Sequence, residues 1–158
     1  MKKVLILLLF SMILMSCSSS KRIVSNSKTT STKIDRIVSN ALKYKGVKYK
    51  FGGTTKRGMD CSGVIYVAFK EESFLLPRVS KDMAKRGRKI SLSKAQKGDL
   101  LFFKTNKSSN KINHVGLIVS NLKGQIKFLH STTSKGVIVS SLSQNYWKKV
   151  FVKATKVL

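Results

Sequence analysis

The stretch from Tyr49 to Phe69, YKFGGTTKRGMDCSGVIYVAF, changes character half-way along. Its first half contains three glycines, which disfavour a helix, whereas its second half is a compact apolar run typical of a buried helix. The change falls at Asp60-Cys61-Ser62, so Cys61 is predicted to lie in the first turn of a helix that runs to about Glu71. Backbone N–H groups and the helix dipole favour a thiolate there. A structural cysteine is the commoner alternative.

The length and charge of the chain limit what it can be. The 158 residues leave room for a single domain of ordinary size. Lys and Arg number 32 against 6 acidic residues, a net charge of +26, which predicts attraction to polyanions. The basic residues are scattered and are not interleaved with aromatic side chains, so a nucleic-acid partner is not expected.

The N-terminus is typical of an exported protein. Two lysines precede an apolar run from Val4 to Leu14, which is too short to span a membrane, and residues 1–16 are interpreted as a signal peptide. Leu14-Met15-Ser16-Cys17 resembles the lipobox of bacterial lipoproteins, which implies lipidation of Cys17 and a membrane anchor. Ordinary signal cleavage is the alternative. By the same resemblance, Ser18 favours the outer membrane of a bacterial cell envelope, with the protein facing the periplasm.

Residues 17–33 are rich in Ser, Thr and Lys, and we expect a flexible tether there. If Cys17 is lipidated, Cys61 is the only free thiol of a secreted protein. An unpaired cysteine in such a protein is expected to be reactive or paired with another molecule.

The domain that follows, residues 34–158, is predicted to be α+β. An apolar face repeats from Ile34 to Leu42 with a start near Thr32, and a short helix is expected over 80–86. Period-two patterns then predict five strands, and a turn or short helix is expected over 144–147. The strands are predicted at 100–104, 114–120, 125–130, 136–140 and 150–156. Helices followed by strands favour an antiparallel sheet packed on the cysteine helix.

The only two histidines, His114 and His130, are predicted to be cross-strand neighbours. They lie 16 residues apart about a turn signal at residues 121–124, so a hairpin there sets them within about one register step. Opposed side chains in an antiparallel pair approach closely enough for one imidazole to bond the other. Two opposed histidines together with one free thiol indicate nucleophilic catalysis.

Six motifs in order resemble the NlpC family of papain-like cell-wall cysteine peptidases. They are YKFGG with GMDCSG, LPRVS, KGDLLFF, NHVGLIV and FLHSTTSKGV. The resemblance implies a papain-like fold and hydrolysis of peptidoglycan stem peptides, between D-glutamate and meso-diaminopimelate. It also implies Cys61 as nucleophile, His114 as base and His130 as the orienting residue. A thiolate–imidazolium pair of Cys61 and His114 is expected.

The same resemblance places Tyr49, Asp60 and Ser62 in the substrate cleft. Arg78 has the geometry to bind a stem-peptide carboxylate, although a loop ion pair is an equal alternative. Met83 stands where relatives often carry glutamine, and the hairpin between the histidines is longer than in many members.

We expect a monomer without cofactor or metal. Two other functions stay open: a zinc hydrolase using Cys61 and both histidines, and a non-catalytic wall-binding lipoprotein.

Overall fold

The computed structural model describes the chain from Lys21 to Leu158. The predicted signal peptide and Cys17 lie outside these residues, and their assignments stay predictions. The described part contains no helix that is both long and apolar enough to cross a membrane. Residues 31–158 form one compact unit, which contains every sheet and every candidate site residue that the structure describes.

The first described helix, α2, runs from Lys21 to Leu42 and is longer than expected. The structure therefore differs from the predicted tether, because the chain is helical from Lys21 onward. Neither glycine nor proline interrupts residues 21–42, and a helix that has formed one stable turn extends at little cost. Ile37, Val38 and Ala41 are buried, as the apolar face predicted. The chain leaves the helix through Gly46, whose φ of 89° favours glycine.

Two short segments separate α2 from the sheet. The glycine-rich stretch forms a two-strand ribbon of β1 (Thr54–Thr55) and β2 (Gly58–Met59), followed by α3 (Cys61–Lys70) as predicted. The short helix α4 (Ser80–Met83) ends three residues before the expected boundary at Arg86. Met83 is fully buried in the core. Its side chain therefore contributes to packing in this chain.

The main sheet has six strands in the order β3-β8-β4-β5-β6-β7, all antiparallel. The five predicted strands are confirmed with ends moved by one or two residues: β4 (Leu100–Phe103), β5 (His114–Leu122), β6 (Gln125–Thr132), β7 (Gly136–Ser141) and β8 (Phe151–Lys156). The sixth strand, β3 (Arg88–Ile90), was not predicted, because it is a short edge strand with two exposed basic residues. A 3-10 turn (Leu92–Lys94) and α5 (Asn145–Val150) complete the chain.

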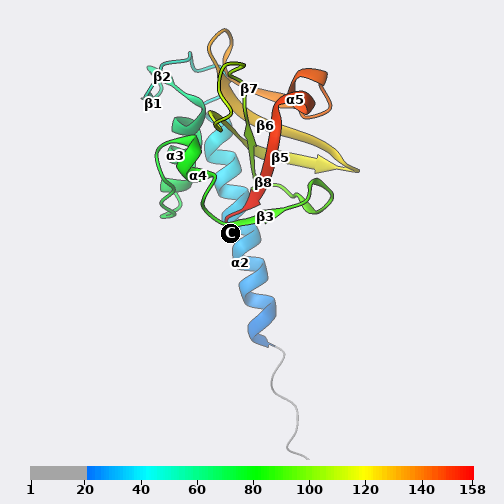
Figure 1. Ribbon diagram of the computed structural model, residues 1–158. Coiled ribbons are helices and arrows are strands. Elements are labelled where there is room, and N and C mark those ends of the chain that lie inside the picture. The colour runs from blue at the N-terminus through cyan, green and yellow to red at the C-terminus, as the bar shows by residue number, and fades with distance from the viewer. Residues whose placement is uncertain (1–20) are drawn as a thin grey trace, which may run out of the picture. The chain divides into compact units, whose positions relative to one another are not determined.

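Apolar clusters cover both faces of the sheet. On one face α3 packs against Val115, Leu117 and Leu129. On the other, Trp147 of α5 packs with Phe103 and Phe128. Figure 1 shows α3 in green and α5 in orange on either side of β5 and β6. The cysteine helix and α5 are thereby fixed against the same two strands from opposite faces.

Candidate active site

Cys61 is the first residue of α3, with Asp60 as its cap. The Asp60 carboxylate accepts a hydrogen bond of 2.6 Å from the Gly63 N–H, which fixes the first turn of the helix. The backbone N–H groups of Val115, Ser62 and Cys61 itself face the sulfur. The cysteine therefore occupies the predicted place at a helix start, and the beginning of β5 supplies a further donor.

Asp60, Ser62 and Arg78 form one bonded cluster behind the helix start. The Arg78 guanidinium contacts both carboxylate oxygens of Asp60, at 3.0 and 2.9 Å, and donates to the Ser62 hydroxyl at 2.9 Å and the Gly53 carbonyl at 3.2 Å. Asp60 also accepts from the Gly52 N–H at 2.8 Å. These bonds tie the glycine-rich loop to α3. The substrate contacts expected of these three residues stay a prediction.

Gly63 lies where the glycine-rich loop touches α3. A Cβ at this position would collide with the Gly53 carbonyl oxygen, far inside van der Waals contact. The DCSG motif thus has a physical meaning for each residue. The aspartate caps the helix, the cysteine presents its sulfur, the serine bonds the cluster, and the glycine admits the loop.

The two histidines are hydrogen-bonded to each other, as the hairpin argument predicted. Nε2 of His114 lies 3.0 Å from Nδ1 of His130, and the rings are nearly perpendicular at 82°. Both side chains are buried, His130 completely. This bond leaves Nδ1 of His114 as the ring nitrogen available to a thiol.

The register of the hairpin differs from the expected direct opposition. Leu117 pairs with Leu129, which places Gly116 opposite His130, so His114 is a diagonal neighbour. A β-bulge at Val119 causes this register, because Ile118 and Ser120 pair with the consecutive residues Phe128 and Lys127. Without the extra residue His130 would oppose Leu117. His114 and His130 would then point to opposite faces of the sheet.

Two further residues complete the environment of the histidines. The Ser140 hydroxyl on β7 lies 2.8 Å from Nε2 of His130, and the Trp147 ring stacks on His114 at a centroid distance of 5.4 Å. The Trp147 and His130 rings are nearly perpendicular, with their centroids 4.6 Å apart. Neither residue was identified from the sequence. Strand pairing of β6 with β7 places His130 opposite Ile138, so Ser140 is the diagonal neighbour, and the seryl contact follows from that register.

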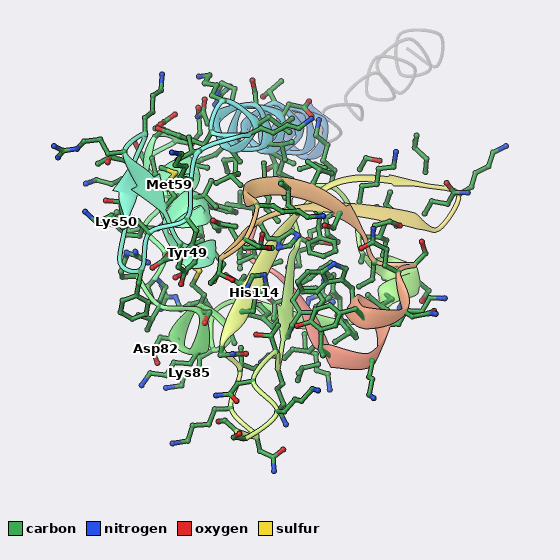
Figure 2. All side chains as sticks on the ribbon, turned by 90° about the horizontal axis from the view of Figure 1, so that it is seen from above. Tyr49, Lys50, Met59, Asp82, Lys85 and His114 are labelled. Atoms are coloured by element: carbon green, nitrogen blue, oxygen red, sulfur yellow. The ribbon has the colours of Figure 1, made fainter. Side chains whose placement is uncertain are left out.

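A cavity of about 440 Å³ brings the reactive groups together. Cys61, His114 and Tyr49 line it, together with residues of the β4–β5 loop, the end of β6, the β6–β7 turn and α5: Thr105, Asn113, Ser131, Thr132, Thr133, Ser134, Tyr146 and Trp147. Figure 2 labels His114 near the centre of the molecule with Tyr49 beside it. Asp60, Ser62 and Arg78 are not among the lining residues.

Burial decides the protonation of the resting site. It raises the pKa of the Cys61 thiol to about 11, and the N–H groups that face the sulfur lower that pKa by less. Burial also lowers the pKa of His114 to about 4. At neutral pH both groups are uncharged. Burial therefore works against a thiolate–imidazolium pair before substrate binds, and the pair expected during catalysis stays a prediction.

The other ionisable groups of the site stay neutral for the same reason. Burial, with a smaller contribution from neighbouring His114, lowers the pKa of His130 to about 3. Burial first, then the proximity of Cys61 and Asp60, raises the pKa of Tyr49. Tyr49 therefore keeps its hydroxyl proton and can donate a hydrogen bond into the cavity.

The arrangement does not resemble a metal centre. Among residues 21–158 no group of three or more His, Cys, Asp or Glu side chains is placed to hold a metal ion. Nε2 of His114 and Nδ1 of His130 point at each other. Those two nitrogens would have to separate before both could join the Cys61 sulfur on one ion, as a zinc site requires.

The comparison with known proteins agrees with this geometry. A family model described as NlpC/P60 family matches residues 46–156. The chain belongs to the NlpC/P60 family. Solved structures of this family share its helices and antiparallel sheet, which confirms the papain-like α+β fold. One of them, a lipoprotein-like NLP/P60 protein from Staphylococcus aureus subsp. aureus Mu50, has a TM-score of 0.69 at 32% identity, covering 80% of this chain and 42% of that one.

Two NlpC/P60 relatives come from Escherichia coli strain K12. The first is named murein DD-endopeptidase MepS/murein LD-carboxypeptidase and is 39% identical over 124 residues, 78% of this chain and 62% of that protein. The second is named probable endopeptidase NlpC and is 36% identical over 155 residues, 96% of this chain and 97% of that protein. The chain thus spans less than two thirds of MepS but nearly all of NlpC.

Proposed function

We propose that this NlpC/P60 protein is a cysteine peptidase that hydrolyses the stem peptides of bacterial peptidoglycan. One observation carries the proposal. Cys61 at the start of α3 and His114 line the same cavity, and His114 is aligned by a 3.0 Å bond to His130. The name of MepS, a murein DD-endopeptidase, supports the substrate class, and the name of NlpC, a probable endopeptidase, supports the type of reaction.

Because Cys61 and His114 are both neutral before reaction, the first proton transfer in the proposed mechanism runs from Cys61 to His114. We assign Nε2–H of His130 as donor to Ser140, which leaves its Nδ1 to accept the Nε2–H of His114. His114 then has a lone pair on Nδ1. It takes the Cys61 proton as the sulfur attacks the substrate carbonyl, and later gives that proton to the leaving amine.

The same site contains donors for the tetrahedral intermediate. The N–H of Cys61 lies in the first turn of α3, where no intrahelical acceptor competes for it. The Tyr49 hydroxyl is a second candidate, because Tyr49 lines the cavity and stays protonated. Together they would stabilise an oxyanion at the carbon attacked by the sulfur.

The bond cleaved has two candidates. Resemblance of the motifs favours the bond between D-glutamate and meso-diaminopimelate within one stem. The name of MepS favours instead a D,D bond of a cross-link. The two differ in products, because only the second reaction separates two joined stems.

We also propose that Cys17 is lipidated and anchors the protein to the outer membrane, facing the periplasm. The lipobox-like LMSC stretch and the lipoprotein-like S. aureus structure support this. A Cys17→Ala protein should appear in the soluble fraction and still hydrolyse peptidoglycan fragments. Membrane retention of that variant would exclude the anchor.

The test of the activity is a digestion of purified peptidoglycan followed by mass analysis of the fragments. The full-length protein should release fragments of one bond class, and the Cys61→Ala variant should release none. Unchanged sacculi with both proteins, together with retention of the protein on them, would favour the non-catalytic wall-binding alternative. Activity that is lost on chelation and unaffected by iodoacetamide would favour the zinc hydrolase.

A further inference from the structure

A second hollow of about 640 Å³ is lined by two of the segments that also line the candidate catalytic cavity. We name it the lysine groove, after Lys104, Lys107 and Lys149. Its other lining residues come from the same two segments, the β4–β5 loop and the end of α5 with the start of β8: Asn106, Ser109, Asn110, Val150, Phe151 and Val152. The β4–β5 loop and α5 also line the catalytic cavity, through Thr105 and Asn113 on one side and Tyr146 and Trp147 on the other. Residues that are close in sequence therefore line the two hollows.

The walls of the lysine groove are held in place by hydrogen bonds. Thr105 and Asn113 close the base of the β4–β5 loop, with the Thr105 N–H donating to Asn113 at 2.8 Å and the Asn113 amide donating to the Thr105 hydroxyl at 3.0 Å. The Lys104 N–H donates to the Val150 carbonyl at 2.9 Å, which joins the loop to the end of α5. The groove thus exists before any ligand binds.

No carboxylate side chain of the protein neutralises this groove. The sequence from Leu100 to Leu158 contains neither aspartate nor glutamate. All six acidic residues precede it, and each is bonded elsewhere: Asp35 to Lys97, Asp60 to Arg78, Glu71 to Tyr44, Glu72 to Arg36, Asp82 to Lys85 and Asp99 to the Gln96 N–H. Three lysines around one hollow without an internal counter-ion make a site for an external anion.

We propose that the lysine groove binds carboxylates of the peptide substrate that lie outside the cleaved bond. This rests on the proposed function, and on the two segments that line both hollows: a stem peptide held in the cavity would reach the lysine groove by crossing the β4–β5 loop or the end of α5. Stem peptides carry free carboxylates on D-glutamate, diaminopimelate and the terminal alanine. A lysine ammonium is a flexible point charge, suited to carboxylates at variable spacing. The groove acts on binding and leaves the chemistry at Cys61 unchanged.

The experiment compares two triple variants of the full-length protein. One removes the groove charges by Lys104→Gln, Lys107→Gln and Lys149→Gln. The matched control removes three exposed lysines elsewhere by Lys89→Gln, Lys123→Gln and Lys127→Gln. Each is assayed on a stem peptide with free carboxylates and on the same peptide with those carboxylates converted to amides.

The groove variant should lose about fivefold in kcat/KM on the free-carboxylate peptide, through KM, because exposed ion pairs contribute modestly. It should match the wild type on the amidated peptide, and the control variant should match the wild type on both. Equal losses on the two peptides, or equal losses by the two variants, would overturn the proposal. So would a groove variant that loses only its binding to vesicles of anionic lipid.

A binding measurement separates this inference from the proposed activity. Trp147 is the only tryptophan and lines the cavity, so its fluorescence in a Cys61→Ala background reports peptide binding without turnover. If the wild type cleaves neither peptide, the proposed function fails, and the groove is still tested by this titration. The proposal is supported if the groove variant binds the free-carboxylate peptide more weakly, while it binds the amidated peptide normally and the control variant binds both peptides normally. Unchanged binding contradicts it.

Discussion

Nε2 of His114 lies 3.0 Å from Nδ1 of His130, although the residue opposite His130 in the sheet is Gly116. The histidines meet diagonally, on one face, because the bulge at Val119 shifts the register by one residue. Gly116 belongs to the same arrangement, since a Cβ there would collide with the Phe128 ring. The HVG motif therefore combines the proposed base with the close packing beneath it.

The alignment of His114 predicts a ranking of variants. His114→Ala removes the base and should abolish turnover. His130→Ala should lower kcat by about 10²–10⁴-fold, whereas His130→Asn keeps an acceptor for the His114 N–H and should retain more activity. Ser140→Ala should cost about tenfold, the loss of one hydrogen bond. Steady-state kinetics on a stem peptide measures all four. Wild-type turnover by His130→Ala would refute the orienting role.

The Asp60–Arg78 contact predicts a measurable coupling energy. The pair is bidentate, and 11% of the Asp60 side chain is exposed. Asp60→Asn and Arg78→Met should each destabilise the protein. The double variant should lose about 1–3 kcal/mol less free energy of unfolding than the two single variants lose together, because the partners share one hydrogen-bond network. Urea unfolding of the four proteins gives the coupling, and additive losses would show that the pair does not hold the loop.

Gly63→Ala tests the close approach of the glycine-rich loop. Alanine gains about 1 kcal/mol of helix propensity over glycine, so an unconstrained helix site would be stabilised. Here the new Cβ would collide with the Gly53 carbonyl, and both the melting temperature and the turnover should fall. A more stable Gly63→Ala protein would contradict the contact.

The buried neutral groups predict how stability varies with pH. Both histidines have folded pKa values below the ordinary value of 6.5, so the unfolded chain binds more protons between about pH 4 and 6.5. The free energy of unfolding should therefore fall as the pH is lowered through this window. The pKa of Cys61 is raised from 9.0 to about 11, so the free energy of unfolding should fall a second time as the pH rises through that range.

Urea titrations across pH measure both slopes. Replacing both histidines by asparagine should flatten the acid slope, and Cys61→Ala should flatten the alkaline slope. An unchanged acid slope in the double variant would mean that other groups control acid stability.

Local patterns explain why much of the fold could be predicted. The apolar run after Cys61 and the period-two segments after Ile90 each specify one element, because burial of one face leaves little choice of structure. The first part of α2, residues 21–31, and the edge strand β3 were missed for the opposite reason. Polar segments carry no periodic signal. The structure of residues 21–31 depends on the helix that they continue, and that of β3 depends on the strand β8 with which it pairs.

Two parts of the candidate site could be predicted from the sequence: the position of Cys61 at a helix start, and the proximity of the two histidines across a hairpin. Ser140 and Trp147 were not, since their contacts depend on the register of β7 and on the docking of α5. The opposing effect of burial on the protonation of the site was not visible in the sequence either. A helix start lowers a thiol pKa, but only the folded structure shows how far the sulfur is removed from water.

The most direct test of the account compares alkylation of Cys61 with loss of hydrolysis. A full-length Cys17→Ala protein leaves Cys61 as the single thiol. Its reaction with iodoacetamide is followed by intact mass while peptidoglycan hydrolysis is assayed in parallel. We expect slow alkylation at neutral pH that accelerates toward pH 11, and activity that falls in proportion to the fraction of Cys61 modified. Hydrolysis that persists after complete modification of Cys61 would contradict the nucleophilic role of the thiol.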